Sequence, residues 1–201
     1  MKYEPGTALI VVDVQNDFVD PRGSLHVRGA EEVLDAVNRE IHAARAAGVP
    51  IFYTQDWHPE RTPHFNTDGG IWPPHCIHDT WGAQFHPKLH LHGPAYFLKK
   101  GVGGEDGYSA FTVRDPETDE HTSTGLVDRL RELGIRHIAV VGYATDYCVH
   151  DTAKDAIRHG FEITAIADAM KPVDLKPDDG ERALEEISAR GAHVERAEAA
   201  A

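Results

Sequence analysis

The sequence is short of cysteine, of basic residues and of long apolar runs, and each shortage excludes a class of protein. Two cysteines, Cys76 and Cys148, cannot build a disulfide framework, so a reducing compartment is expected. Lys and Arg number 20 against 33 Asp and Glu, and the net charge of −13 argues against nucleic acid and anionic membranes as partners. The longest apolar run near the N-terminus, residues 8–12, is too short to span a bilayer and does not read as a signal peptide. We therefore expect a cytoplasmic protein.

Helical and strand-like segments alternate along the chain. Amphipathic runs stop at Gly48, Gly134, Gly160 and Gly191, and a β-rich apolar run follows each glycine. Glycine is a common helix stop because it adopts the left-handed conformation at no steric cost. This alternation predicts an α/β fold with helices on both faces of a mainly parallel sheet. The expected strands lie near residues 7–13, 49–54, 95–99, 137–142, 161–167 and 192–195.

Three segments depart from the alternation. Residues 55–93 form a long irregular excursion rich in His, Pro and Trp, and loops of this length in a compact domain are usually functional. Residues 112–123 are polar and acidic and predict a solvated loop, and the last five residues, 197–201, are expected to fray. Nothing resembles an interdomain linker, so we predict a single domain over residues 1–201.

Two side chains follow predicted strands and could carry out chemistry. Asp13 ends the first strand, at the edge where open α/β sheets bind ligands, and could shuttle a proton. Cys148 follows the fourth strand, and Thr145 or Asp146 is a suitable helix N-cap. The first helical turn would then lower the pKa of the Cys148 thiol and offer N–H groups to an oxyanion. The alternatives are a turn aspartate and a buried structural cysteine.

Lys99 and Lys100 end the third predicted strand. Strand alternation directs one of them into the cleft and the other away from it, unless both are solvated. The glycines that follow, residues 101–104, lack the Gly-Lys-Ser/Thr ending of a phosphate-binding loop.

A carboxylate and three imidazoles in the excursion have the composition of a metal site. Asp56 and His58 lie two residues apart just past a strand, so their side chains share a face. With His64 and His75 they suit zinc, iron(II) or manganese. With 14 histidines in the chain, the alternative is four unrelated polar loop residues. We predict loop and surface positions for the neighbouring histidines, His78, His86, His90 and His92, and a packed thiol for Cys76.

These residues fall within motifs that resemble the nicotinamidase/pyrazinamidase branch of the isochorismatase-like hydrolases. The motifs run in the family's order over most of the chain. They are Asp13-Val-Gln-Asn-Asp-Phe18, Asp56-x-His58, His64, Trp72-Pro-Pro-His75, Lys100-Gly101, Tyr108-Ser-Ala-Phe111 and Gly142-Tyr-Ala-Thr-Asp-Tyr-Cys148-Val.

The resemblance implies a three-layer, isochorismatase-like fold with sheet order 3-2-1-4-5-6, and a role for each motif residue. Asp13, Lys100 and Cys148 would form a catalytic triad, and the backbone N–H groups of Ala144 and Cys148 an oxyanion hole after a cis Tyr143–Ala144 peptide. The implied metal ligands are Asp56, His58, His64 and His75. The implied substrate-binding residues are Phe18, Trp72, Tyr108 and Tyr147, the last standing where many relatives have histidine.

The implied activity is that of a metal-dependent cysteine amidohydrolase. It would convert nicotinamide to nicotinate and ammonia through a thioester, act on pyrazinamide too, and serve NAD salvage. It would use one divalent metal ion, with zinc as the first choice and iron or manganese as alternatives. The expected partner is a small-molecule substrate, and the sequence is compatible with a homo-oligomer.

Three other functions compete with this interpretation. A relative acting on another small amide or carbamoyl group would keep the triad and change the pocket. A vinyl-ether hydrolase of the isochorismatase type would need neither the cysteine nor the metal. A non-catalytic metal-binding protein would leave Asp13, Lys100 and Cys148 unexplained.

Overall fold

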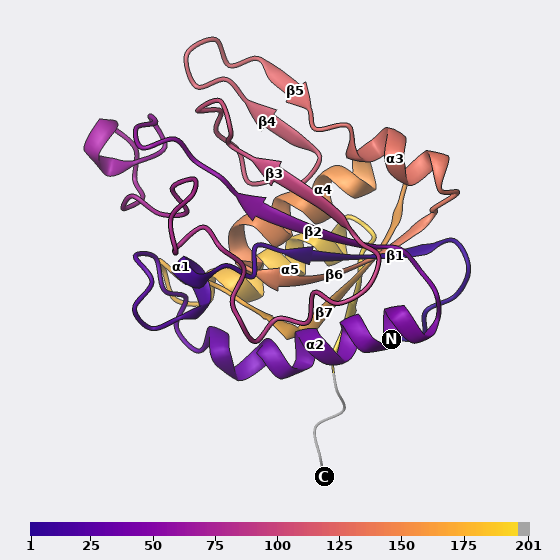
Figure 1. The fold of residues 1–201 in the computed structure, drawn as a ribbon. Helices are drawn as coiled ribbons and strands as arrows, with labels where there is room; N and C mark the ends of the chain where they lie inside the picture. The colour runs from indigo at the N-terminus through magenta and orange to yellow at the C-terminus, as the bar shows by residue number, and fades with distance from the viewer. Residues whose placement is uncertain (197–201) are drawn as a thin grey trace.

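Six parallel strands form the central sheet in the computed structural model, which describes residues 1–196 (Figure 1). The strands are β1 (Thr7–Val12), β2 (Ile51–Asp56), β3 (Tyr96–Lys100), β6 (His137–Tyr143), β7 (Glu162–Lys171) and β8 (His193–Glu195). Their order is β3-β2-β1-β6-β7-β8, with parallel pairing throughout. Counted along the chain this is 3-2-1-4-5-6, which confirms the predicted fold class. Residues 197–201, the predicted frayed tail and the end of the predicted domain, lie outside the described residues.

Helices cover both faces of the sheet, as the alternation predicts. On one face lies α2 (Ala30–Ala46), and on the other lie α3 (Leu126–Glu132), α4 (His150–Arg158) and α5 (Asp179–Ala189) (Figure 1). The single turns α1 (Asn16–Val19), η1 (Asn66–Asp68) and η2 (Thr145–Val149) complete the helical elements. Within residues 1–196, none of these helices combines the length and apolar character that a membrane span requires.

The central strand β1 is buried on both faces because it lies between two hydrophobic cores. Leu9 and Val11 pack in the core under α2, while Ala8, Ile10 and Val12 pack in the core under α3, α4 and α5. This alternation explains why the first strand is apolar throughout, as is typical of a parallel sheet covered on both sides.

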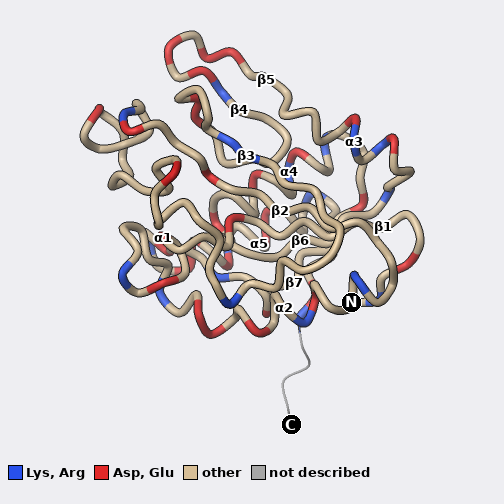
Figure 2. The backbone as a smooth tube through the Cα atoms, in the orientation of Figure 1, with Lys and Arg blue, Asp and Glu red and all other residues tan. Residues whose placement is uncertain are grey.

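Charged residues avoid the centre of the sheet. Strands β1 and β6 contain no Lys, Arg, Asp or Glu, and Figure 2 shows them tan among the red and blue segments of the surrounding helices and loops. Asp13, Asp56 and Lys100 are the buried exceptions that stand at carboxyl ends of strands. Buried charges require compensation, so this edge is where a functional site is expected.

The long excursion between β2 and β3 is irregular apart from η1, as predicted. Isolated bridges hold it together, pairing His58 with Ile77 and Phe65 with Trp72. A further bridge joins Phe85 to Gln15, just after β1. The excursion is therefore fixed beside the carboxyl ends of β1 and β2.

The prediction of a solvated loop over residues 112–123 is wrong. Strands β4 (Thr112–Arg114) and β5 (His121–Ser123) form an antiparallel hairpin there, with Arg114 opposite His121. Its tight turn is closed by the Asp115 carboxylate, which accepts the N–H groups of Glu117 and Thr118 at 2.8 and 2.9 Å. All three β5 residues are exposed, so the hairpin shows no alternation of apolar and polar residues that could reveal it.

Two glycines with positive φ provide a test of the packing between β1 and β6. Gly142 on β6 has φ of 113°, and a Cβ there would collide with the Val12 backbone, whereas Gly160 has φ of 87° and a Cβ there would meet no described atom within 4 Å. Gly142→Ala should lower the free energy of unfolding by about 3 kcal/mol or more, from backbone strain plus overpacking. Gly160→Ala should lose only about 1 kcal/mol, from the strain alone. Urea unfolding of both variants measures the difference, and equal losses would contradict the steric explanation.

Candidate active site

Three side chains from distant parts of the chain meet at the carboxyl edge of the sheet. Asp13 follows β1, Lys100 ends β3, and Cys148 lies in η2 after β6. The Lys100 ammonium is 2.8 Å from Asp13 Oδ2 and 3.4 Å from Cys148 Sγ. Their exposed fractions are 0% for Asp13, 1% for Lys100 and 5% for Cys148. The structure thus brings together the three residues predicted to form the triad.

The choice between the two lysines follows from the direction of their side chains. Lys100 points into the site and also donates to the Asp56 carboxylate. Lys99 points the other way, and its ammonium lies 3.3 Å from the ring centroid of Trp57, a cation–π contact outside the site. Strand alternation required one lysine on each side, and the structure places Lys100 inside.

The pKa values of Lys100, Asp56 and Asp13 depend on one another, because all three side chains are buried and in contact. Burial opposes the ammonium form, but Asp13 and Asp56 raise the pKa of Lys100 well above its usual value. Burial also disfavours a charged Asp56, but Lys100 and His58 hold the pKa of Asp56 well below its usual value. For Asp13 burial prevails over Lys100, and its pKa is raised. Asp13 is therefore the carboxylate better suited to accept a proton.

The environment of Cys148 differs from the predicted one. Ala144 is the N-cap of η2 and no side chain caps it; the Asp146 carboxylate instead accepts the N–H groups of Val173 and Asp174, each at 2.9 Å. Burial raises the pKa of the Cys148 thiol well above its usual value, although Lys100 acts in the opposite direction. The prediction of a side-chain cap and a lowered thiol pKa is therefore wrong, because no side chain caps η2 and burial raises the pKa of the thiol. The Tyr143–Ala144 peptide is cis, as the resemblance implies.

The four predicted metal ligands also converge. Nitrogen atoms of His58, His64 and His75 lie within 4.8 Å of one another. Asp56 Oδ2 is 3.8 Å from His58 Nε2 and 3.9 Å from His75 Nε2. All four side chains are buried. One carboxylate and three imidazoles are a donor set that divalent transition metals bind well.

The ring nitrogens of the histidines test whether a cation fits. His75 Nδ1 lies 2.7 Å from the Pro73 carbonyl, which can only accept, so Nδ1 carries the proton and Nε2 keeps its lone pair. Burial lowers the pKa of His75 to about 4, which keeps the ring neutral as a ligand must be. Both ring nitrogens of His58 are buried without a hydrogen-bond partner among the described residues. Such groups are costly unless a ligand takes them up, so the residues fit a divalent cation.

An aromatic pocket opens above the cysteine and the histidines. Trp72 Nε1 donates to Tyr108 Oη at 3.0 Å, and the Tyr147 ring packs against both rings at centroid distances of 4.8 and 5.1 Å. Phe18 packs against His75 at 5.6 Å. The full lining is Phe18, Leu25, Asp56, His64, Trp72, His75, Tyr108, Ala144, Tyr147, Cys148 and Val173. The four predicted substrate-binding residues therefore surround one small pocket that includes Cys148.

Several residues of the site were not found from the sequence. Thr54 Oγ1 donates to Asp13 Oδ1 at 2.6 Å, and Gln15 binds both the N–H and the carbonyl of Asp56 at 2.8 and 2.7 Å. Leu25 and Val173 line the pocket as single apolar residues of loops, which have no sequence signal. Gln15 lies within the first motif, which was the one available clue.

The other four histidines of the excursion and Cys76 lie outside the proposed ligand set, and their burial can be compared with the predictions. His78 and His92 are exposed and His90 is half-buried, as predicted, but His86 is buried, so its predicted surface position is wrong. The His86 backbone N–H donates to Val14 at 2.9 Å, which draws this residue in beside β1. Cys76 is fully buried and packed, as predicted.

The sequence is similar to known proteins over almost its whole length. The family model described as the isochorismatase domain matches residues 7–199, and the chain belongs to this family. The nicotinamidase of Escherichia coli (strain K12) is 35% identical over 204 residues, covering 94% of this chain and 93% of that protein.

Two solved structures are similar over nearly the whole chain. The pyrazinamidase of Pyrococcus horikoshii in complex with zinc is 38% identical with a TM-score of 0.84, covering 96% of this chain and 99% of that one. PnC1 of L. infantum in complex with nicotinate is 37% identical with a TM-score of 0.85, covering 96% and 93%.

The low pKa of His75 predicts how acid affects the metal-free protein. Its pKa is about 4 in the folded state against 6.5 ordinarily, so the unfolded chain takes up the proton first as pH falls. His75 should therefore cost the folded state up to about 3 kcal/mol between pH 6.5 and 4. In His75→Asn, which keeps a donor to the Pro73 carbonyl, that part of the loss should vanish. Urea unfolding of both chelator-treated proteins across this pH window measures the loss. If the free energy of unfolding falls with pH equally in the wild type and in His75→Asn, the prediction is refuted.

Proposed function

We propose that this protein is a metal-dependent cysteine amidohydrolase that converts nicotinamide to nicotinate and ammonia. The observation that carries the proposal is the Lys100 ammonium between Asp13 Oδ2 and Cys148 Sγ, at the base of an aromatic pocket. Beside it one carboxylate and three imidazoles converge. The similarity to the Escherichia coli nicotinamidase and to the nicotinate complex of L. infantum PnC1 supports this choice of substrate.

In the first half of the reaction Cys148 attacks the amide carbon. The acceptor atoms of Asp13 and Asp56 and the Cys148 sulfur lie within 4.8 Å of one another, so the thiol proton passes to Asp13 as the carbon–sulfur bond forms. The Lys100 ammonium favours the thiolate by charge. The backbone N–H groups of Ala144 and Cys148 hold the oxyanion, and each such donor lowers the activation free energy by about 3–4 kcal/mol.

In the second half the carbon–nitrogen bond breaks and the thioester is hydrolysed. Asp13 gives its proton to the departing nitrogen, which leaves as ammonia, and a thioester on Cys148 remains. Asp13 then takes a proton from water, whose oxygen attacks the thioester carbon. The carbon–sulfur bond then breaks, and the proton on Asp13 passes to the Cys148 sulfur. The product leaves as the carboxylic acid and loses its proton to water to become nicotinate. One carboxylate thus serves as base, acid and base again, which suits its raised pKa.

Asp56, His58, His64 and His75 would hold the divalent cation, and zinc is our first choice for this donor set. When bound, the cation supplies a Lewis acid that accepts an electron pair from the substrate or from water. Phe18, Trp72, Tyr108 and Tyr147 enclose the ring of the substrate. Pyrazinamide, which has the same ring size and the same carboxamide, should also be a substrate.

Cys148→Ala tests the covalent route. Ammonia release from nicotinamide should fall roughly 10⁴-fold or more, because the nucleophile is lost. The content of bound metal should not change, because Cys148 is not among the four ligands. Undiminished turnover would exclude the thioester. If the metal-loaded wild type releases ammonia only from another amide in a panel, nicotinamide is the wrong substrate, and the proposed amide hydrolysis is retained.

His58→Ala tests the metal site. Both ring nitrogens are buried without a hydrogen-bond partner among the described residues, and Nε2 lies 3.8 Å from Asp56 Oδ2, so loss of the side chain should leave the purified protein with far less metal than one ion per chain. Elemental analysis of the purified protein measures this content. His78→Ala is the matched control, because the His78 side chain is exposed and pairs with Asp79 at 3.0 Å, outside the cluster. Equal metal content in both variants would refute the assignment of His58.

A further inference from the structure

One residue outside the proposed metal ligands contacts them through a charged hydrogen bond. Asp106 Oδ1 lies 2.8 Å from His64 Nδ1 and also accepts the N–H of Gly107 at 2.7 Å. Its other oxygen, Oδ2, accepts from Arg114 Nη2 at 2.8 Å. Both oxygens of this half-buried carboxylate are therefore engaged, and its orientation is fixed from two sides.

The contact determines which nitrogen of His64 is left for a cation. The two oxygens of Asp106 already accept from the Gly107 N–H and from Arg114, so Asp106 is a carboxylate that only accepts. Nδ1 of His64 therefore carries the proton, and the lone pair of Nε2 is free. A carboxylate that binds the second nitrogen of a metal-ligating histidine fixes both the tautomer and the ring direction.

The three histidines of the cluster are supported differently. His75 is oriented by the Pro73 backbone carbonyl, and His58 has no hydrogen-bond partner among the described residues. Only His64 of these three has its ring held by another side chain in the described structure. The hydrogen bond to the His64 ring can therefore be removed by substituting the Asp106 side chain, whereas the bond to His75 comes from a backbone carbonyl that no substitution removes.

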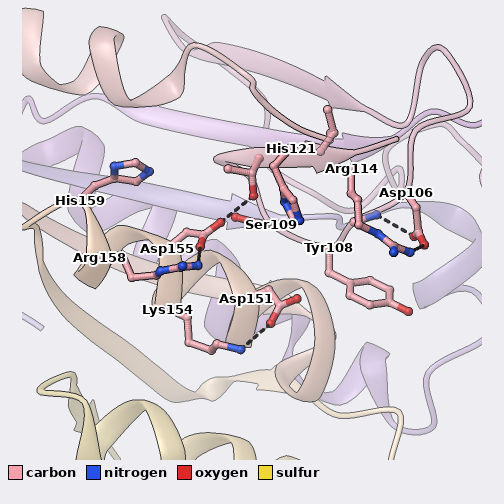
Figure 3. A pocket seen from close by; sticks show the side chains of 13 residues that line it. Asp106, Tyr108, Ser109, Arg114, His121, Asp151, Lys154, Asp155, Arg158 and His159 are labelled. Carbon is pink, nitrogen blue, oxygen red and sulfur yellow. Dashed lines mark hydrogen bonds and ion pairs between the residues drawn. The ribbon is translucent and has the colours of Figure 1, made fainter. Parts of the chain in front are cut away.

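The polar hairpin holds Asp106 in place. Asp106 and Arg114 exchange two backbone hydrogen bonds, of 2.7 and 2.6 Å, so Asp106 lies along β4. Arg114 Nη1 also pairs with Asp119, farther along the hairpin, at 2.9 Å. Figure 3 shows the Arg114 side chain directed at Asp106, with Tyr108 nearby, on the wall of a cavity of about 780 Å³. Because Arg114 faces this cavity rather than a core, its side chain can be changed without repacking the interior.

We propose, on the basis of the metal-dependent function proposed above, that Asp106 is a positioning residue which holds His64 in the orientation that binds the metal, and that Arg114 holds Asp106. Asp106 does not line the substrate pocket, and it reaches the proposed cation site through His64. Its loss should therefore weaken metal binding while leaving turnover at saturating metal nearly unchanged.

Zinc affinity, measured by competition with a chelator, tests the proposal without reference to activity. Asp106→Ala should raise the zinc dissociation constant roughly 10–100-fold, the usual effect of removing such a partner. Asp106→Asn should have a smaller effect, since its amide oxygen still accepts from Nδ1 without the charge. Arg114→Met should also have a smaller effect. Asp119→Asn is the matched control: it removes the charge of the other carboxylate that pairs with Arg114, it does not contact His64, and the variant should bind zinc as the wild type does.

A double-mutant cycle separates positioning from a general structural role. In a His64→Ala background, Asp106→Ala should cause no further loss of zinc affinity, because the ring it orients is gone. An equal loss in both backgrounds would overturn the proposal, and so would an unchanged dissociation constant in a folded Asp106→Ala protein. Unfolding curves of the metal-free variants establish that they are folded.

The failures of the two proposals are distinguishable. A wild type that binds no zinc refutes the metal site and this proposal together. A wild type that binds zinc and releases ammonia from nicotinamide, while Asp106→Ala binds zinc equally well, refutes only the role of Asp106.

Discussion

The buried ammonium of Lys100 is the interaction on which the rest of the site depends. It lies between Asp13 and Asp56, both of them almost without contact with solvent. Breaking a buried ion pair by removing one partner typically costs about 3–5 kcal/mol. Two carboxylates against one ammonium leave a negative balance, which a cation among the histidines would offset. Asp56 contacts Lys100 as well as two of the proposed histidine ligands, so the charges of the proposed triad and of the proposed metal site depend on each other.

The parallel sheet explains how such a concentration of charge can form. Residues 13, 100 and 148 are far apart in the chain, yet β1, β3 and β6 all end at the same edge of the sheet. Strand β1 is central, and the chain reverses its direction of winding beside it, which is where open α/β sheets commonly bind ligands. The apolar strands supply the rigid support, and the residues just past their ends supply the chemistry.

Sequence patterns with a regular period predicted the fold well. The apolar β1 and the repeated sequence of helix, glycine and strand led to five of the six strands of the main sheet, and the family resemblance implied their order. The expected strand at residues 95–99, which lies outside this repeat, matches β3. The hairpin of β4 and β5 was missed because it buries too little to show a period. The prediction for the local environment of Cys148 was wrong because it inferred a helix cap from residue type. The Asp146 carboxylate instead binds the backbone after β7.

The residues of the candidate site differ in how far the sequence could reveal them. The motif residues come together as expected, although their catalytic and ligand roles stay predictions. Thr54 and Asp106 contact residues of the site through side-chain hydrogen bonds across 41 and 42 positions, and no local sequence pattern indicates such pairings. Leu25 and Val173 likewise enter the pocket only because of tertiary folding.

The four proposed metal ligands all come from residues 56–75, whereas the proposed triad comes from three distant segments. A cation bound there would cross-link short loops, whose closure costs little conformational entropy. The excursion would thus behave as a locally cross-linked unit attached to a sheet that has its own core. Loss of the cation would loosen the wall of the pocket first and leave Asp13, Lys100 and Cys148 in place on the strands.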